Sequence, residues 1–136
     1  MIVVDTSVVV KWAVEEEGAE AARQLINKQP LAPDLVIVET GHVLTRKVRR
    51  RELDEVDAAI AFEQLPRLLE ITSSRPLERR AFELSLSLHH SMFDCYFLAL
   101  AEAADAELVT ADQVFVRKAR ELDGRSPVRL LGETGA

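Results

Sequence analysis

Short apolar runs alternate with longer amphipathic segments along the chain. The runs at 2–4, 68–72, 107–110 and 128–131 have the length of strands, and the one at 128–131 is expected at a sheet edge. Between them, apolar residues recur at helical spacing in 8–14, 19–28, 35–49, 53–65, 76–88, from Ser91 onward, and in 113–122. Strands that alternate with helices predict an α/β fold, a three-layer α/β/α sandwich with a mainly parallel central sheet.

Prolines divide this pattern at two places. Residues 30–33 read Pro-Leu-Ala-Pro, which is too rich in proline for a helix and predicts a short extended piece. The segment at 53–65 is expected to turn Val56, Ile60 and Leu65 inward and to end at Pro66.

Length and composition indicate one globular domain. The 136 residues are 48% hydrophobic and 29% charged, which predicts a single domain over 1–131 and a loose tail over 132–136. No run approaches the roughly 20 apolar residues that span a bilayer, so we expect no membrane association and a cytoplasmic protein. Cys95 is the only cysteine and is interpreted as a core residue. The net charge of -6 argues against binding nucleic acid by general attraction but is compatible with an acidic nuclease site.

Four acids stand at positions where a site could form. Asp5 and Asp112 follow apolar runs, Asp94 lies in the first turn of a helix, and Glu39 shares an apolar helix face. Each also has a structural interpretation. The aspartates could cap helices, with Ser91 and Asp94 close to a capping box, and Glu39 could pair with a core arginine or a hydroxyl.

Taken as a set, the acids favour metal chemistry. Strand ends near the switch point of a doubly wound sheet meet in one crevice, where pooled carboxylates repel one another unless a cation neutralises them. We expect no well-placed histidine, because the adjacent pair at 89 and 90 should point in different directions, so a hard oxygen-ligated ion such as Mg²⁺ is favoured. Its substrate would carry anionic oxygens, as a phosphodiester does, and the hydroxyls that could position water or a carboxylate are those of Thr6, Ser7 and Thr110.

A basic cluster ends the helix at 35–49 and extends past it: Arg46, Lys47, Arg49, Arg50 and Arg51. A solvated helix end explains most of this charge, and contact with an RNA backbone is the alternative. Other chemistries lack their motifs, since the chain contains neither a phosphate-binding glycine loop nor a nucleophile elbow.

The segments that carry these acids are IVVDTSVVVKW, LVIVETGHVL, SMFDCYFLALAEA and LVTADQVF. In this order and spacing they resemble the PIN-domain family, and within it the VapC-type toxins of toxin–antitoxin pairs, over residues 1–131. The resemblance implies a Mg²⁺- or Mn²⁺-dependent endoribonuclease that forms a homodimer and is inhibited by a VapB-type antitoxin. It also implies an acidic metal site at Asp5, Glu39, Asp94 and Asp112, with Thr6 and Thr110 in support.

The chain departs from the family pattern in two places. Ala104-Asp105-Ala106 stands where a glycine is common, and the residues after Asp112 include no further acid that would support a second metal. Three other functions stay open: an RNA-processing PIN nuclease without an antitoxin, a receiver-like signalling module with an acidic Mg²⁺ pocket, and a degenerate PIN domain that only binds partners.

Overall fold

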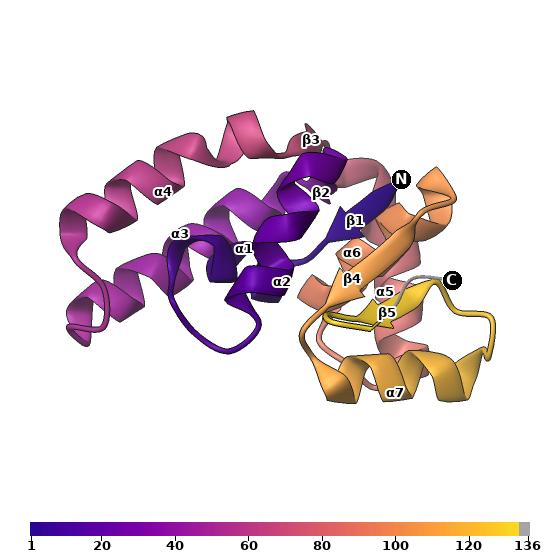
Figure 1. Ribbon diagram of the computed structural model, residues 1–136. Coiled ribbons are helices and arrows are strands. Elements are labelled where there is room, and N and C mark those ends of the chain that lie inside the picture. Colours follow the sequence, from indigo (N-terminus) through magenta and orange to yellow (C-terminus); the bar gives the residue numbers. More distant parts are fainter. Residues whose placement is uncertain (134–136) are drawn as a thin grey trace.

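A five-stranded parallel sheet forms the centre of the molecule (Figure 1). The computed structural model describes residues 1–133, and its strands are β1 (Ile2–Val4), β2 (Leu31–Pro33), β3 (Glu70–Thr72), β4 (Glu107–Thr110) and β5 (Val128–Leu130). They lie in the order β3-β2-β1-β4-β5, with every neighbouring pair parallel. This confirms the predicted sheet, and it makes the expected extended piece at 30–33 a strand of that sheet.

Helices connect the strands and cover both faces of the sheet. The first group, before β3, comprises α1 (Thr6–Ala13), α2 (Ala19–Gln24), η1 (Leu25–Lys28), α3 (Leu35–Arg49) and α4 (Glu55–Leu68). The second comprises η2 (Arg75–Leu77), α5 (Glu78–Leu88), α6 (Met92–Ala104) and α7 (Gln113–Leu122). Helix α1 contacts α2, α3 and α4, whereas α5 contacts α6 and α7, so each group packs as its own layer. The α/β sandwich is therefore confirmed.

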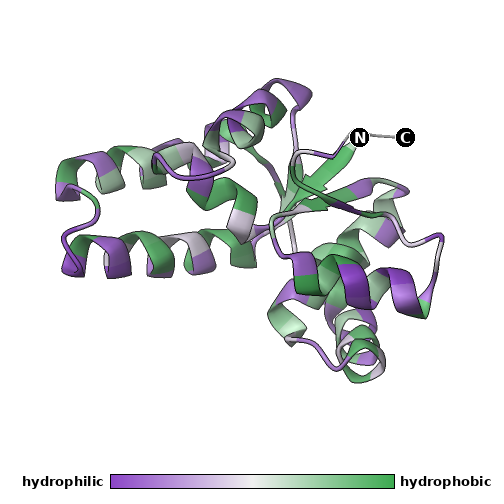
Figure 2. Cartoon of the chain, turned by 60° about the horizontal axis from the view of Figure 1, so that its bottom comes forward, coloured by the Kyte–Doolittle hydropathy of each residue, from purple (hydrophilic) through white to green (hydrophobic). Residues whose placement is uncertain are grey.

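The core lies between the sheet and these helices. Val3, Val4 and Val109 in the central strands are fully buried, and α6 contributes Cys95 and Phe97, also fully buried. Figure 2 shows hydrophobic residues along the central strand and a mixture of both kinds along the α3–α4 pair. Burial raises the pKa of the Cys95 thiol to about 12, which agrees with its interpretation as an inert core residue.

Helices α3 and α4 form a pair that projects away from the sheet (Figure 1), and two expectations for α4 are wrong. Val56 and Ile60 are 65% and 50% exposed, because α4 packs on α3 through Ala58 while Leu65 enters the core. Pro66 lies inside α4 and does not end it. Proline removes one helical donor, but the amide of Leu69 still donates to the Leu65 carbonyl.

Asp105 forms the turn between α6 and β4 in the left-handed conformation, with φ of 52°. Aspartate tolerates this region better than most residues, so the chain makes the turn without the glycine that is common there.

The chain after β5 folds back on α7. Arg120 Nη2 lies 2.8 Å from Glu133 Oε2, and the Arg129 guanidinium donates to the Glu133 carbonyl. Residues 134–136 of the expected loose tail lie outside the described residues. Within residues 1–133, no helix has both the length and the apolar character needed to cross a membrane.

Candidate metal centre at the carboxyl ends of β1 and β4

The site lies where the strand order reverses. The chain runs outward from β1 through β2 to β3 and then returns to β4 on the other side of β1. In open α/β sheets, ligands usually bind at the carboxyl ends of the strands that flank such a reversal, which here are β1 and β4. Asp5 directly follows β1, and Asp112 follows β4 by two residues.

Asp5 is a buried carboxylate held by hydrogen bonds. Only 3% of its surface is exposed, and its Oδ1 accepts from the Ser7 hydroxyl and from the Val8 amide at 3.3 Å. The Ser7 hydroxyl in turn accepts from the Ala111 amide at 2.9 Å, which ties the end of β1 to the end of β4. Burial, with a smaller contribution from the negative charge of Asp94, raises the pKa of Asp5 to about 6 against the lowering effect of the Ser7 and Thr110 hydroxyls and the Val8 amide.

Glu39 reaches the same region from α3. Its Oε1 accepts a 3.0 Å hydrogen bond from the Thr6 hydroxyl at the start of α1. Burial raises the pKa of Glu39 to about 6, with further contributions from the charges of Asp94 and Asp5. A hydroxyl partner is what the structural interpretation of Glu39 anticipates, but this hydrogen bond leaves the negative charge of the carboxylate uncompensated.

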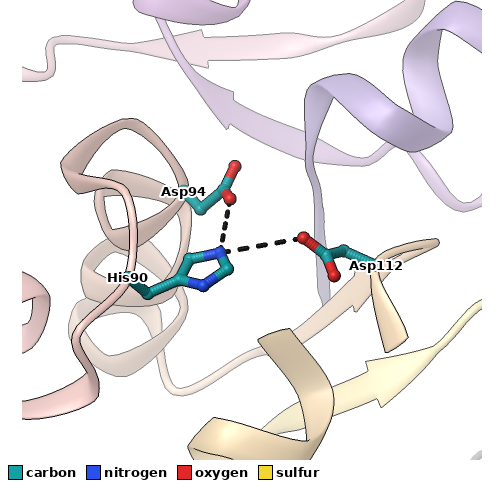
Figure 3. Close-up of side chains that lie close together, drawn as sticks. All are labelled: His90, Asp94 and Asp112. Carbon is teal, nitrogen blue, oxygen red and sulfur yellow. Dashed lines mark hydrogen bonds and ion pairs between the residues drawn. The ribbon is translucent and has the colours of Figure 1, made fainter. Parts of the chain in front are cut away.

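Asp94 and Asp112 meet at a histidine. Figure 3 shows the imidazole of His90 between them, with its Nε2 2.6 Å from Asp94 Oδ2 and 3.7 Å from Asp112 Oδ2. Ligand atoms of these three residues all lie within 4.8 Å of one another. Burial raises the pKa of Asp94, while the hydrogen bond from His90 lowers it in part. The expectation of no well-placed histidine is therefore wrong.

The backbone explains why His90 reaches the acids. His89 ends α5 in the left-handed conformation, with φ of 51°, and the chain then turns through His90 and Ser91 into α6. His90 thus lies just before the helix whose first turn contains Asp94. The sequence contains one signal of this contact, since His90 and Asp94 are four residues apart. The spacing brings the two side chains together only because of this turn and because α7 packs against the ring through Phe115.

Two of the aspartates also cap helices. Asp5 caps α1, and Asp112 caps α7 by accepting from the Phe115 amide at 3.1 Å through Oδ1. Capping and a role in the site coexist at Asp112, because its other carboxylate oxygen faces His90. The alternative interpretation of Ser91 and Asp94 as a capping box is wrong, since the Ser91 side chain accepts no capping hydrogen bond and Asp94 pairs with His90.

The three predicted hydroxyls lie among the acids. Thr6 donates to Glu39, and Ser7 donates to Asp5. Thr110 is fully buried at the end of β4, where its Oγ1 accepts from the Asp112 amide at 3.1 Å and lies 3.4 Å from the Ser7 Oγ. The three side chains therefore fix the positions of the acids that flank them.

The four acids act on one another electrically. The charge of Asp94 raises the pKa of Asp5 and of Glu39, and the charge of Asp112 raises that of Asp94. Among residues 1–133, no lysine, arginine or histidine forms an ion pair with Asp5 or Glu39. A cluster of carboxylates with so little internal compensation suits a cation supplied from solution.

The predicted basic cluster lies far from these acids, at the tip of the projecting α3–α4 pair (Figure 1). A rise of 1.5 Å per residue puts Arg49 about 15 Å along α3 from Glu39. Lys47 pairs with Glu16 and Glu52, at 3.7 and 3.6 Å. Arg49, Arg50 and Arg51 are exposed, whereas Arg46 and Lys47 are half-buried, so solvation of the helix end explains the last three residues of the cluster.

A family model described as the PIN domain matches residues 2–121. The chain belongs to the PIN domain family. Ribonuclease VapC1 of Mycobacterium tuberculosis is 36% identical over 115 residues, which cover 81% of this chain and 84% of the relative.

Two solved structures share the fold. One is VapC20 of Mycobacterium tuberculosis, described as a toxin that cleaves the sarcin-ricin loop, with a TM-score of 0.68 at 19% identity over 86% of this chain and 95% of that one. The other is from a toxin-antitoxin complex of Klebsiella pneumoniae, with a TM-score of 0.65 at 16% identity over 98% of this chain and 100% of that one.

Proposed function

We propose that this PIN domain is a Mg²⁺-dependent endoribonuclease, with Mn²⁺ able to replace Mg²⁺, and that it acts in the cytoplasm as the toxin of a type II toxin–antitoxin pair. One observation carries the proposal: Asp5, Glu39, Asp94 and Asp112 come together at the sheet's switch point, where the charge of Asp94 raises the pKa of Asp5 and of Glu39 and the charge of Asp112 raises that of Asp94. Membership of the PIN domain family and a curated relative named as a ribonuclease support it.

The donor set fits a hard divalent cation. Asp5, Glu39, Asp94 and Asp112 offer carboxylate oxygens, which Mg²⁺ and Mn²⁺ prefer, and the region contains no thiolate ligand because the Cys95 thiol stays protonated. These four residues would hold the ion. When bound, such an ion supplies a Lewis acid that activates water and stabilises the leaving oxygen of a phosphodiester.

The protein's own residues hold the acids in place for this chemistry. The Thr6 hydroxyl orients Glu39, and the Ser7 hydroxyl orients Asp5 while it bridges to the Ala111 amide of the next strand. Thr110 fixes the backbone that leads to Asp112. Because each acid is set by a hydrogen bond, the carboxylates meet a cation without first losing side-chain entropy.

The exposed arginines at the tip of the α3–α4 pair support contact with RNA at a distance from the four acids. Within the proposed function, Arg46, Lys47, Arg49, Arg50 and Arg51 bind backbone phosphates. The acidic site itself repels phosphates until a cation is bound, so basic groups some distance away help to hold the substrate.

A VapB-type antitoxin is the proposed protein partner. A groove of about 720 Å³ lies between α3 and α4, lined by Val38, Gly41, Leu44 and Phe62 among others. Its apolar lining and the similarity to a chain of a toxin-antitoxin complex support an antitoxin segment with apolar side chains in this groove.

A homodimer is also part of the proposal. Phe82 and Leu86 on α5 and Phe93 on α6 are 55%, 61% and 60% exposed, which supports a surface for self-association.

Cleavage of RNA with the ends mapped tests the proposed function. We expect the wild-type protein to cut total RNA with Mg²⁺ or Mn²⁺ and to stop cutting when EDTA is added. The rate should fall at least about 100-fold in Asp5→Asn or Asp94→Asn, because each carboxylate would hold the cation, and losing an electrostatic stabiliser of the transition state costs about 3 kcal/mol. Asp54→Asn is the control, since Asp54 caps the start of α4, which lies at the tip of the projecting α3–α4 pair (Figure 1). Equal cutting by Asp94→Asn and wild type would refute the site.

A further inference from the structure

His90 is enclosed by groups that determine what its ring nitrogens can do. Its side chain is 10% exposed, and its ring stacks on Phe115 with centroids 4.5 Å apart and planes 16° from parallel. One nitrogen, Nε2, faces Asp94 Oδ2 at 2.6 Å, and the other, Nδ1, faces Lys118 Nζ at 3.4 Å. Phe115 and Lys118, which contact the ring face and Nδ1, both belong to α7.

The contact with Lys118 bears on which ring nitrogen of His90 carries the proton. Its ammonium is anchored by donating to the His89 carbonyl at 2.7 Å, and an ammonium has donors only. A hydrogen bond between Lys118 Nζ and Nδ1 therefore requires Nδ1 to accept, and the proton of a neutral imidazole then lies on Nε2. A protonated Nε2 has no lone pair for a metal, so in this arrangement it donates to the Asp94 carboxylate.

We propose that Lys118 and His90 form a relay that positions Asp94, with the Nε2–H of His90 engaging one carboxylate oxygen and leaving the other for the cation. The relay rests on the proposed function, because it assigns a role next to the same carboxylates. His90 acts through Asp94 and is a positioning residue, not a metal ligand. Phe115 holds the plane of the ring, and Lys118 holds its tautomer.

Calorimetry with Mn²⁺ alone tests the relay without RNA. His90→Phe keeps an aromatic ring for Phe115 but removes the donor, and we expect its Mn²⁺ affinity to fall by roughly 10- to 100-fold, as for other groups that orient a metal ligand. His90→Gln restores an N–H near the place of Nε2 and should recover most of that affinity. His89→Asn is the matched control, because His89 is exposed and asparagine accepts its left-handed backbone.

The tautomer gives a second readout that simple packing would not change. In ¹⁵N NMR of metal-free wild type near neutral pH, we expect His90 to show a protonated Nε2 and an unprotonated Nδ1, and to keep this pattern when Mg²⁺ is added. Lys118→Met removes the ammonium, so the two tautomers should become mixed.

Two results would overturn the relay and leave the nuclease assignment intact: wild-type affinity for Mn²⁺ in His90→Phe, or a proton on Nδ1 in the wild-type protein. The second result would make His90 a direct ligand. A wild-type protein that neither binds Mn²⁺ nor cuts RNA would instead refute the proposed function, and the relay with it.

Discussion

Asp5→Asn should make the metal-free protein more stable at neutral pH. Asp5 is 3% exposed, and its pKa rises from 3.8 to about 6 on folding. A shift of about two pKa units corresponds to about 3 kcal/mol of unfavourable free energy in the folded state at pH 7, at 1.36 kcal/mol per unit. Asparagine keeps the shape and can accept from the Val8 amide, so a gain of about 1–3 kcal/mol is expected.

The sign of the pH dependence follows from the direction of this shift. Because the pKa of Asp5 is higher in the folded than in the unfolded chain, the folded state holds more protons between pH 4 and 6. The penalty is absent below the unfolded pKa of 3.8, grows through this window and is constant above it. The advantage of Asp5→Asn should therefore be near zero at pH 4 and complete at pH 7.5.

Urea unfolding in EDTA at both pH values measures this difference. Asp54→Asn is the matched control, because Asp54 also caps a helix through its side chain but is exposed, so its replacement should change stability by less than about 0.5 kcal/mol. Adding Mg²⁺ should reduce the advantage of Asp5→Asn, since the ion binds the wild-type carboxylates more tightly. The reasoning fails if Asp5→Asn is less stable than wild type at pH 7.5, or if its gain is equally large at pH 4.

Two further predictions concern the surface and the core. Replacing Arg49, Arg50 and Arg51 together with alanine should weaken RNA binding. The slope of the logarithm of the binding constant against the logarithm of salt concentration should fall in magnitude by about 2–3, as expected for three lost phosphate contacts. An unchanged slope in filter binding would assign these arginines to solvation of the helix end. The Cys95 thiol, buried and of raised pKa, should react with a maleimide only as fast as the protein unfolds, so rapid labelling of the native protein in mass spectra would contradict its burial.

Local patterns in the sequence predicted most of the fold. The strand at 2–4 and the helix at 35–49 have the predicted bounds, because an apolar run and a helical face are both read from neighbouring residues. The prediction that Val56 and Ile60 point inward is wrong for a related reason. Their spacing marks an apolar face, but only the projection of the α3–α4 pair decides that this face stays exposed.

The sequence predicts those site residues whose position follows from a strand end or from a helix face. Asp5 and Asp112 were found from their positions after apolar runs, and Glu39 from its apolar helix face. His90 was missed, because its role depends on a left-handed residue before it and on Phe115 and Lys118, which are at least 25 residues away and belong to α7. Contacts of this kind are set by tertiary packing, which a single sequence shows poorly.

The hydrogen bond from the Ala111 amide to Ser7 joins residues 104 positions apart in the chain. Closing so long a loop is slow compared with forming a helix, so strands β1 and β4 pair late. During synthesis, which proceeds at about 5–20 residues per second, an emerging chain therefore exposes Asp5 and Glu39 for seconds before Asp94 and Asp112 exist. The set of four acids in a nascent chain therefore stays incomplete until Asp112 has emerged from the ribosome.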